Sequence, residues 1–181
     1  MTLTEEDGRL FYELWFPLLD YVNKKKKVNK GLKDMAHAKE LDLMDVKEIA
    51  DVLWDDVAII DEYLMKMGSK LSKEEAEIIK GWKRRVRGKF FMERHLKKGT
   101  MLIYEDETVY QVIGIISSLE EMFYGAPLPL MMEATLLPFR EVIITDGLVM
   151  PYNIIIGNNA KRMFKDVYMN AKATGKIQTS L

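Results

Sequence analysis

Nine basic residues lie between Lys80 and Lys98 and form the strongest candidate for a binding segment. Trp82, Phe90 and Phe91 are interleaved with them. Cationic side chains hold phosphates and aromatic rings stack on bases, so this composition is typical of a surface that binds nucleic acid or another polyanion. The candidate contacts are Lys80, Lys83, Arg84, Arg85, Arg87, Lys89 and Arg94.

The segment before this block offers another explanation for its charge. Residues 34–79 contain 5 basic and 13 acidic side chains, a net charge of −8, whereas residues 80–98 contain 9 and 1, a net charge of +8. Opposite charges of this size can pair within a fold or between two copies of a chain. The sequence therefore favours a solvated or internally paired face, a protein partner or a homo-oligomer, with nucleic acid as a less favoured partner.

His95 and Glu133 are the candidates for acid–base chemistry. Both lie in segments predicted to be strands, and a carboxylate buried in the apolar run 130–137 could act as a general acid or base in a small hydrolase or transferase. A partly exposed strand histidine and a solvent-facing glutamate explain the same residues without catalysis. Because His37 is the only other histidine and neither lies in a ligand pattern, the sequence predicts no metal site and no cofactor.

A further candidate lies where the last predicted strand meets the last predicted helix. The loop residues are Gly157, Asn158, Asn159, Lys161 and Arg162. Free backbone N–H groups at a helix start, with two nearby cations, can hold an anion. The same residues also suit an ordinary turn with an Asn cap, and the spacing is not that of a phosphate-binding loop.

The elements that position these residues change in character near residue 88. Before it, apolar side chains recur every three or four residues, which predicts helices from Thr4 to the lysines at 24–27, over 45–67 with a break after which Asp55 caps a new helix, and from Ser72 to about residue 86. Pro17 is expected to kink or split the first helix. Ser72 and Glu75 are expected to form a capping box.

After residue 88 the pattern becomes short β-rich runs separated by turns. Strands are expected over 89–95, 100–104, 109–116, 130–137, 141–145 and 153–156, followed by a closing helix that Asn158 or Asn159 caps. Such closely spaced strands favour an antiparallel sheet or small barrel. The predicted fold is α+β, with a helical region over 1–86 and a β-rich domain with a C-terminal helix over 87–181, or one continuous domain.

Composition sets the remaining limits. The chain has 181 residues, of which 48% are hydrophobic, so it can bury a sizeable core. It has no Cys, which excludes disulfides, thiolate metal sites and cysteine nucleophiles. An acidic N-terminus and charges within every apolar stretch predict no signal peptide, no membrane partner and a cytoplasmic location.

Several short motifs resemble a family of uncharacterised bacterial cytoplasmic proteins. They are Leu-Ser-Lys-Glu-Glu at 71–75, Trp-Lys at 82–83, Gly-Lys-Phe at 88–90, Arg-His-Leu at 94–96, Glu-Glu-Met at 120–122, Leu-Leu-Pro-Phe at 136–139, Asp-Gly-Leu at 146–148 and Pro-Tyr-Asn at 151–153. The resemblance implies a bacterial cytoplasmic protein with a C-terminal β module, and it assigns no catalytic residues. Some relatives accompany metal-binding cysteine motifs, which cannot apply to a chain without Cys.

Taken together, the residues favour a non-enzymatic binding or interaction module. Binding of a polyanion through residues 80–98 and a hydrolase or transferase using Glu133 and His95 are the alternatives.

Overall fold

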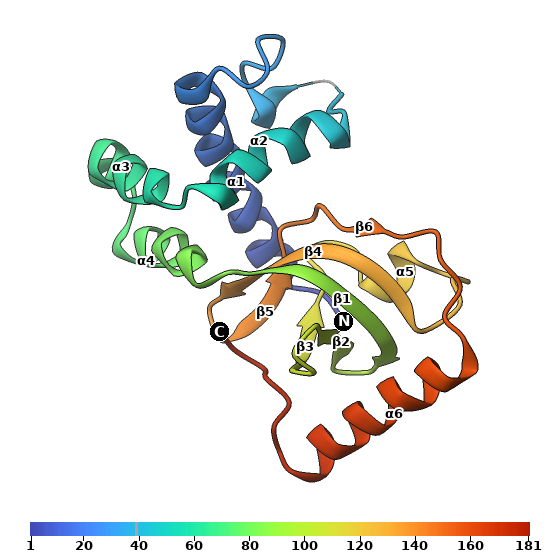
Figure 1. The fold of residues 1–181 in the computed structure, drawn as a ribbon. Coiled ribbons are helices and arrows are strands. Elements are labelled where there is room, and N and C mark those ends of the chain that lie inside the picture. The colour runs from blue at the N-terminus through green and yellow to red at the C-terminus, as the bar shows by residue number, and fades with distance from the viewer. Residues whose placement is uncertain (39) are drawn as a thin grey trace. The chain divides into compact units, whose positions relative to one another are not determined.

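A computed structural model describes residues 1–38 and 40–181, and it divides the chain into two compact units (Figure 1). One unit is Glu5–Lys83, and the other combines Met1–Thr4 with Arg84–Leu181. The sequence placed this division after residue 86 and did not indicate that the first four residues belong with the β half. The predicted α+β fold is confirmed.

The described part of the helical unit contains four α-helices and three short 3-10 turns. The helices are α1 (Glu5–Lys26), α2 (Leu43–Asp55), α3 (Ala58–Met67) and α4 (Lys73–Gly81), and the turns are η1 (Met35–His37), η2 (Gly68–Lys70) and η3 (Trp82–Arg84). Helix α1 begins with three acids and ends with three lysines, which complements the helix dipole. Pro17 does not split it, because the helix runs unbroken from Glu5 to Lys26.

A cluster of stacked and edge-to-face aromatic rings forms the centre of the helical unit. The ring of Trp15 lies 5.3 Å from that of Trp54, 5.6 Å from that of Trp82 and 5.9 Å from that of Phe11. All four side chains are buried. Such pairs add to the stability that comes from burying their area, so this cluster fixes the positions of α1, α2 and the end of α4.

The helix starts agree in part with the sequence. Ser72 and Glu75 form the expected capping box at α4. Asp55, expected to cap α3, is instead the last residue of α2, and α3 follows Val57, which makes no side-chain cap. The prediction failed there because the two helices are joined by only two residues, which leaves no extended residue at the usual capping position.

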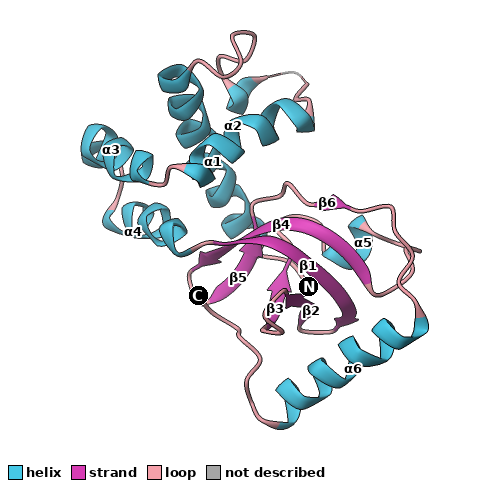
Figure 2. Cartoon of the chain, viewed as in Figure 1, coloured by secondary structure: helices cyan, strands magenta, loops and turns pink. Residues whose placement is uncertain are grey.

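The β unit is a closed barrel of five strands with one short addition (Figure 2). The strands are β1 (Val86–Leu96), β2 (Gly99–Tyr104), β3 (Val109–Ile113), β4 (Leu130–Phe139), β5 (Val142–Thr145) and β6 (Met150–Pro151). The order β1-β2-β3-β5-β4 closes because β1 also pairs with β4. All named pairings are antiparallel except that between β3 and β5, which is parallel.

This connectivity, with α5 (Leu119–Met122) between β3 and β4, is that of an OB-type Greek-key barrel. Alternate residues of each strand face opposite sides. Phe90, Met92 and Leu102 fill the interior, whereas Phe91, Met101 and Ile103 face outward.

Helix α6 (Asn158–Ala173) packs on the outer face of β1, β2 and β3. The ring of Phe164 stacks on that of Phe91 at 4.1 Å, and Tyr168 and Ala171 complete the contact. The chain after α6 then runs beside β3, where Gln178 exchanges backbone hydrogen bonds with Val109 and Gln111. This segment occupies the edge of β3 that β5 leaves unpaired.

Two predictions near the C-terminus were wrong. Residues 153–156 form no strand, and Ile155 is 98% exposed, because the chain pairs with β4 earlier, at Met150 and Pro151. Gly157, and not Asn158 or Asn159, is the N-cap of α6, and it makes no side-chain cap. Among the described residues, none of the helices has the length and apolar character needed to cross a bilayer.

Candidate functional site

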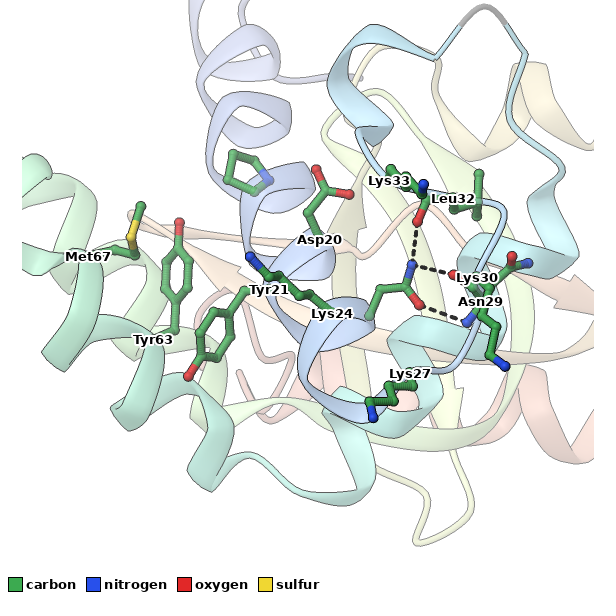
Figure 3. A pocket seen from close by; sticks show the side chains of 12 residues that line it. Asp20, Tyr21, Lys24, Lys27, Asn29, Lys30, Leu32, Lys33, Tyr63 and Met67 are labelled. Atoms are coloured by element: carbon green, nitrogen blue, oxygen red, sulfur yellow. Dashed lines mark hydrogen bonds between the residues drawn. The ribbon is translucent and has the colours of Figure 1, made fainter.

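A pocket of about 770 Å³ opens in the helical unit between α1, α3 and the chain segment that follows α1 (Figure 3). We call it the lysine-rimmed pocket. Its lining consists of Pro17, Asp20, Tyr21, Asn23 and Lys24 from α1, Lys27, Asn29, Lys30, Leu32 and Lys33 from the following segment, and Tyr63 and Met67 from α3. The volume lies within the range of pockets that hold small organic ligands.

Helix geometry explains why α1 supplies five residues of this lining. Pro17, Asp20, Tyr21 and Lys24 recur at three- and four-residue intervals, so they lie on one face of the helix, and Lys27 follows directly after its end. The positions between them carry the buried side chains of the core.

The run of four lysines at the end of α1 is divided between two environments. Lys25 forms an ion pair with Glu62, and Lys26 forms one with Asp56 at 3.2 Å. Lys24 and Lys27 line the pocket instead. Part of the acidic charge of residues 34–79 therefore neutralises the two lysines that face away from the pocket.

Four lysines of the rim have no opposite charge beside them. In the part of the chain that the structure describes, no carboxylate lies within salt-bridge distance of Lys24, Lys27, Lys30 or Lys33. All four are exposed. Asp20 is the one acidic residue in the described lining. The pocket therefore carries an excess of positive charge that an anion would neutralise.

A buried side chain of α1 holds the lysine-bearing segment in place. The Nδ2 of Asn23 donates hydrogen bonds to the carbonyl oxygens of Asn29, at 2.8 Å, and Leu32, at 2.7 Å. Its Oδ1 accepts one from the N–H of Asn29 at 2.7 Å. Because Asn23 is only 5% exposed, these bonds are shielded from water and set where Lys30 and Lys33 enter the rim.

Lys27 has an uncommon backbone conformation at the point where the chain leaves α1. Its φ is 56°, in the left-handed region that usually ends a helix with Gly. A side chain with a Cβ costs about 1–2 kcal/mol in that conformation. The chain thus tolerates strain at a position where it gains a cation in the rim.

Asp20 gives the pocket one acceptor among its cations. Its carboxylate oxygens accept the N–H of Met35 at 3.2 and 3.3 Å. Burial raises the pKa of this carboxyl, the hydrogen bond from Met35 opposes that shift, and nearby Asp34 adds to it. Asp20 can accept a further hydrogen bond from a donor group of a ligand.

The α3 side of the pocket is apolar and aromatic. Tyr21 and Tyr63 meet edge to face at 5.4 Å, Met67 lies nearby, and the ammonium of Lys66 lies 5.3 Å from the centre of the Tyr21 ring. The hydroxyl oxygen of Tyr21 is buried and has no hydrogen-bond partner among the described residues. A buried polar atom without a partner is uncommon in proteins and calls for an explanation.

This arrangement can bind and orient a ligand. The pocket contains no histidine, serine or threonine in its described lining, and no described group of three His, Asp or Glu side chains could hold a metal ion. Lysines, one carboxylate and tyrosine hydroxyls are recognition groups here.

The basic block of residues 80–98 is divided between the two units. Lys80 and Lys83 belong to the helical unit, where they pair with Glu77 and Asp61, and the other five candidates belong to the β unit. There the partners differ: Arg84 donates to the carbonyl of Leu181, Lys89 lies over the Tyr152 ring, and Arg94 pairs with Glu93 and lies 4.0 Å from the centre of the Tyr168 ring. Arg85 and Arg87 are half-buried.

The candidate acid–base pair is not brought together. Glu133 of β4 lies opposite Lys89 of β1, whereas His95 lies six residues further on, about 20 Å along the strand at the usual rise and past the last residue of β1 that pairs with β4. His95 bonds to Thr100 at 2.9 Å, and burial lowers its pKa. These two residues cannot share one proton-transfer site.

The candidate anion loop at 157–162 has the expected place before a helix, and all of its named residues are exposed. No ligand-like feature accompanies it. The lysine-rimmed pocket was missed from the sequence, although its signal was present as lysines at 24, 27, 30 and 33, spaced every three residues across the end of a helix.

Comparisons with known proteins add no assignment. No family model, no curated protein and no solved structure matches this chain.

Proposed function

We propose that this protein is a binding module whose helical unit holds an organic anion in the lysine-rimmed pocket. The observation that carries the proposal is the set of four lysines without carboxylate partners around a largely apolar hollow. Like charges gathered at one site repel each other, and a bound anion removes that repulsion. The apolar wall of Pro17, Tyr21 and Met67 supplies contact for the rest of the ligand.

Features of the β unit support a binding role elsewhere than on the barrel. In OB-type barrels the face of the second and third strands binds oligonucleotides. Here α6 packs on that face with Phe164 and Tyr168. Because most residues of the basic block also have partners within the chain, the pocket is the better supported site for an anion.

We place this activity in a bacterial cytoplasm, as the resemblance of the short motifs implies. A protein partner or a second copy of the chain remains compatible with a ligand-binding role, because the pocket uses one side of the helical unit only.

Paired double variants test the proposal. Titration calorimetry of the full chain with a panel of phosphorylated and carboxylated organic anions should identify binding that weakens as salt is added. Lys24→Gln with Lys27→Gln should weaken it by about tenfold or more, a loss of about 1.4 kcal/mol. Lys25→Gln with Lys26→Gln removes the same charge from the same run but from outside the pocket, and should change it far less.

The control pair is expected to fold, because exposed ion pairs such as Lys25–Glu62 contribute only about 0–1 kcal/mol. Equal effects of the two pairs would mean that net charge alone, and not the pocket, attracts anions. Absence of binding by every anion at low salt would contradict the proposal.

A further inference from the structure

Helix α6 carries positive charge on the surface that the barrel leaves open (Figure 2). Its basic residues are all exposed, and we call them the cationic row: Lys161, Arg162, Lys165 and Lys172. From this row we infer that α6 binds a nucleic acid duplex through its phosphate backbone. The site lies in the β unit and is independent of the pocket, which lies in the helical unit.

Helix periodicity places the members of the cationic row together. Lys165 follows Lys161 by four residues and Arg162 by three, and Lys172 lies seven residues further on. These intervals put side chains on one side of a helix. At a rise of about 1.5 Å per residue the row is about 17 Å long, so one phosphate group cannot meet all of its cations and an extended polyanion can.

The charge of the cationic row is not neutralised within the fold. No carboxylate of the described residues lies within salt-bridge distance of it. The β unit contains 13 basic and 10 acidic side chains, a net charge of +3, and α6, with four basic residues and Asp166, has the same net charge. The rest of the unit is therefore neutral, and α6 carries its whole surplus of positive charge.

The stability of α6 does not account for the cationic row. Like charges four residues apart destabilise a helix, and cations near its start oppose the helix dipole. Lys161 and Lys165 are such a pair, and Lys161 and Arg162 lie near the start of a helix that has no acid in its first turn. A polyanion bound along the row would remove both penalties.

The apolar side of α6 argues against a membrane surface as the partner. An amphipathic helix binds a bilayer by inserting its apolar side among the lipids. In α6 that side carries Phe164, Tyr168 and Ala171 and packs on the barrel, where the ring of Phe164 stacks on that of Phe91. The surface that is left attracts a partner by charge.

The aromatic residues of α6, Phe164 and Tyr168, are both buried, and this favours a duplex over a single strand or a protein. Single strands stack their bases on exposed rings, and protein interfaces centre on aromatic anchors. A duplex needs neither, because its phosphates lie on the outside. It presents about one charge per 1.7 Å, or about ten over the length of the row.

Fluorescence anisotropy of the full chain with labelled duplexes of DNA and RNA tests this inference. Four phosphate contacts predict that the logarithm of the association constant for DNA falls with the logarithm of the salt concentration at a slope of about −3.6. Affinity should then fall about hundredfold between about 50 and 200 mM salt. Two duplexes of unrelated sequence should bind alike, because phosphate contacts carry no sequence information.

Lys165→Gln with Lys172→Gln removes two contacts, so the slope should shrink to about −1.8 and the loss over the same salt range to about tenfold. Lys165→Arg with Lys172→Arg keeps the charge and should behave like the parent. Lys70→Gln with Lys73→Gln is the matched control, because it removes the same charge from exposed positions of the helical unit. The control should keep the parent slope. All three variants should melt at the parent temperature, since the substituted side chains are exposed.

An unchanged slope in Lys165→Gln with Lys172→Gln would overturn the inference. Loss of duplex binding in the control, or in the pocket variant Lys24→Gln with Lys27→Gln, would overturn it as well. So would tighter binding of a single strand than of its duplex, equally tight binding of phosphatidylserine vesicles, or no duplex binding at the lowest salt concentration. The anion-binding proposal for the pocket is decided separately, by small anions and by its own variants.

Discussion

Lys27 shows at the residue scale how this chain combines stability with a charged site. A lysine in the left-handed region is strained, and glycine would relieve the strain at the end of α1. The position lines the pocket, so glycine would also remove one of the four rim cations. Stability and ligand binding should therefore respond in opposite directions to one substitution.

We expect Lys27→Gly to raise the free energy of unfolding by up to about 1 kcal/mol and to weaken anion binding by several-fold. Urea unfolding followed by tryptophan fluorescence measures the first effect, and calorimetry measures the second. Glu107→Gly is the control, because Glu107 has a φ of 67° in a turn far along the chain from the pocket residues. It should relieve similar strain without changing anion binding. Loss of stability in Lys27→Gly would show that the side chain, and not the strain, decides the outcome.

Asp20 makes a prediction about pH. Burial raises its pKa above 3.8, so the folded protein holds this proton more tightly than the unfolded chain does. The stability that the proton contributes is present below pH 3.8 and is lost as the pH rises through the raised pKa of the folded state. Asp20→Asn should therefore be more stable than the parent at pH 7, and the difference should shrink as the pH falls toward 3.8. Urea unfolding of both proteins across this range measures it, and a difference that grows on acidification would contradict the assignment.

The sequence indicated some residues of the site and missed others for a physical reason. The lysines at 24–27 were interpreted as the end of a helix, which they are. Their separation into paired and unpaired members depends on Glu62 and Asp56, which lie more than 25 residues away and reach α1 only in the folded chain. Local patterns cannot show which of several neighbouring lysines has a distant partner.

At the scale of elements, α6 is the helix that covers the outer face of the barrel. It buries Phe164, Tyr168 and Ala171 against the outer face of β1 to β3. Its remaining surface is largely polar, with Met163 and Met169 about half exposed. One stripe of the helix therefore carries its attachment to the barrel.

We expect Phe164→Ala to destabilise the β unit by about 3–5 kcal/mol, the usual cost of removing a buried phenylalanine. The reasons are the lost area and the lost stacking on Phe91 at 4.1 Å. Met163→Ala, one residue earlier on the exposed side, should change stability by no more than about 0.5 kcal/mol. Thermal unfolding followed by circular dichroism compares the two. Similar melting temperatures would mean that α6 is held by its ends and not by this stripe.

Elements whose signals are local were predictable, and those that depend on distant pairing were not. The capping box at Ser72 and most strand positions followed from short patterns. The parallel pairing of β3 with β5 joins segments about 30 residues apart and leaves no local trace. The run 153–156 looked like a strand, but its residues form no strand and Asn153, Ile154 and Ile155 lie exposed.

At the scale of the whole molecule, the two compact units have separate aromatic reporters. All three tryptophans, Trp15, Trp54 and Trp82, belong to the helical unit and pack together in its core. Tryptophan fluorescence therefore follows the unit that contains the pocket. Circular dichroism follows the helices and strands of both units.

Because each unit has its own core, we expect urea to produce fluorescence and circular dichroism transitions that do not coincide. A ligand of the pocket binds the folded helical unit alone, so it should move the fluorescence transition to a higher urea concentration. At a free ligand concentration one hundred times the dissociation constant, the free energy of unfolding of this unit should rise by about 2.7 kcal/mol. Phe164→Ala should instead lower the urea concentration at which the β unit unfolds, which circular dichroism detects and tryptophan fluorescence does not. If ligand and Phe164→Ala moved both signals together, the units would unfold as one body, and binding in the pocket would be coupled to the barrel.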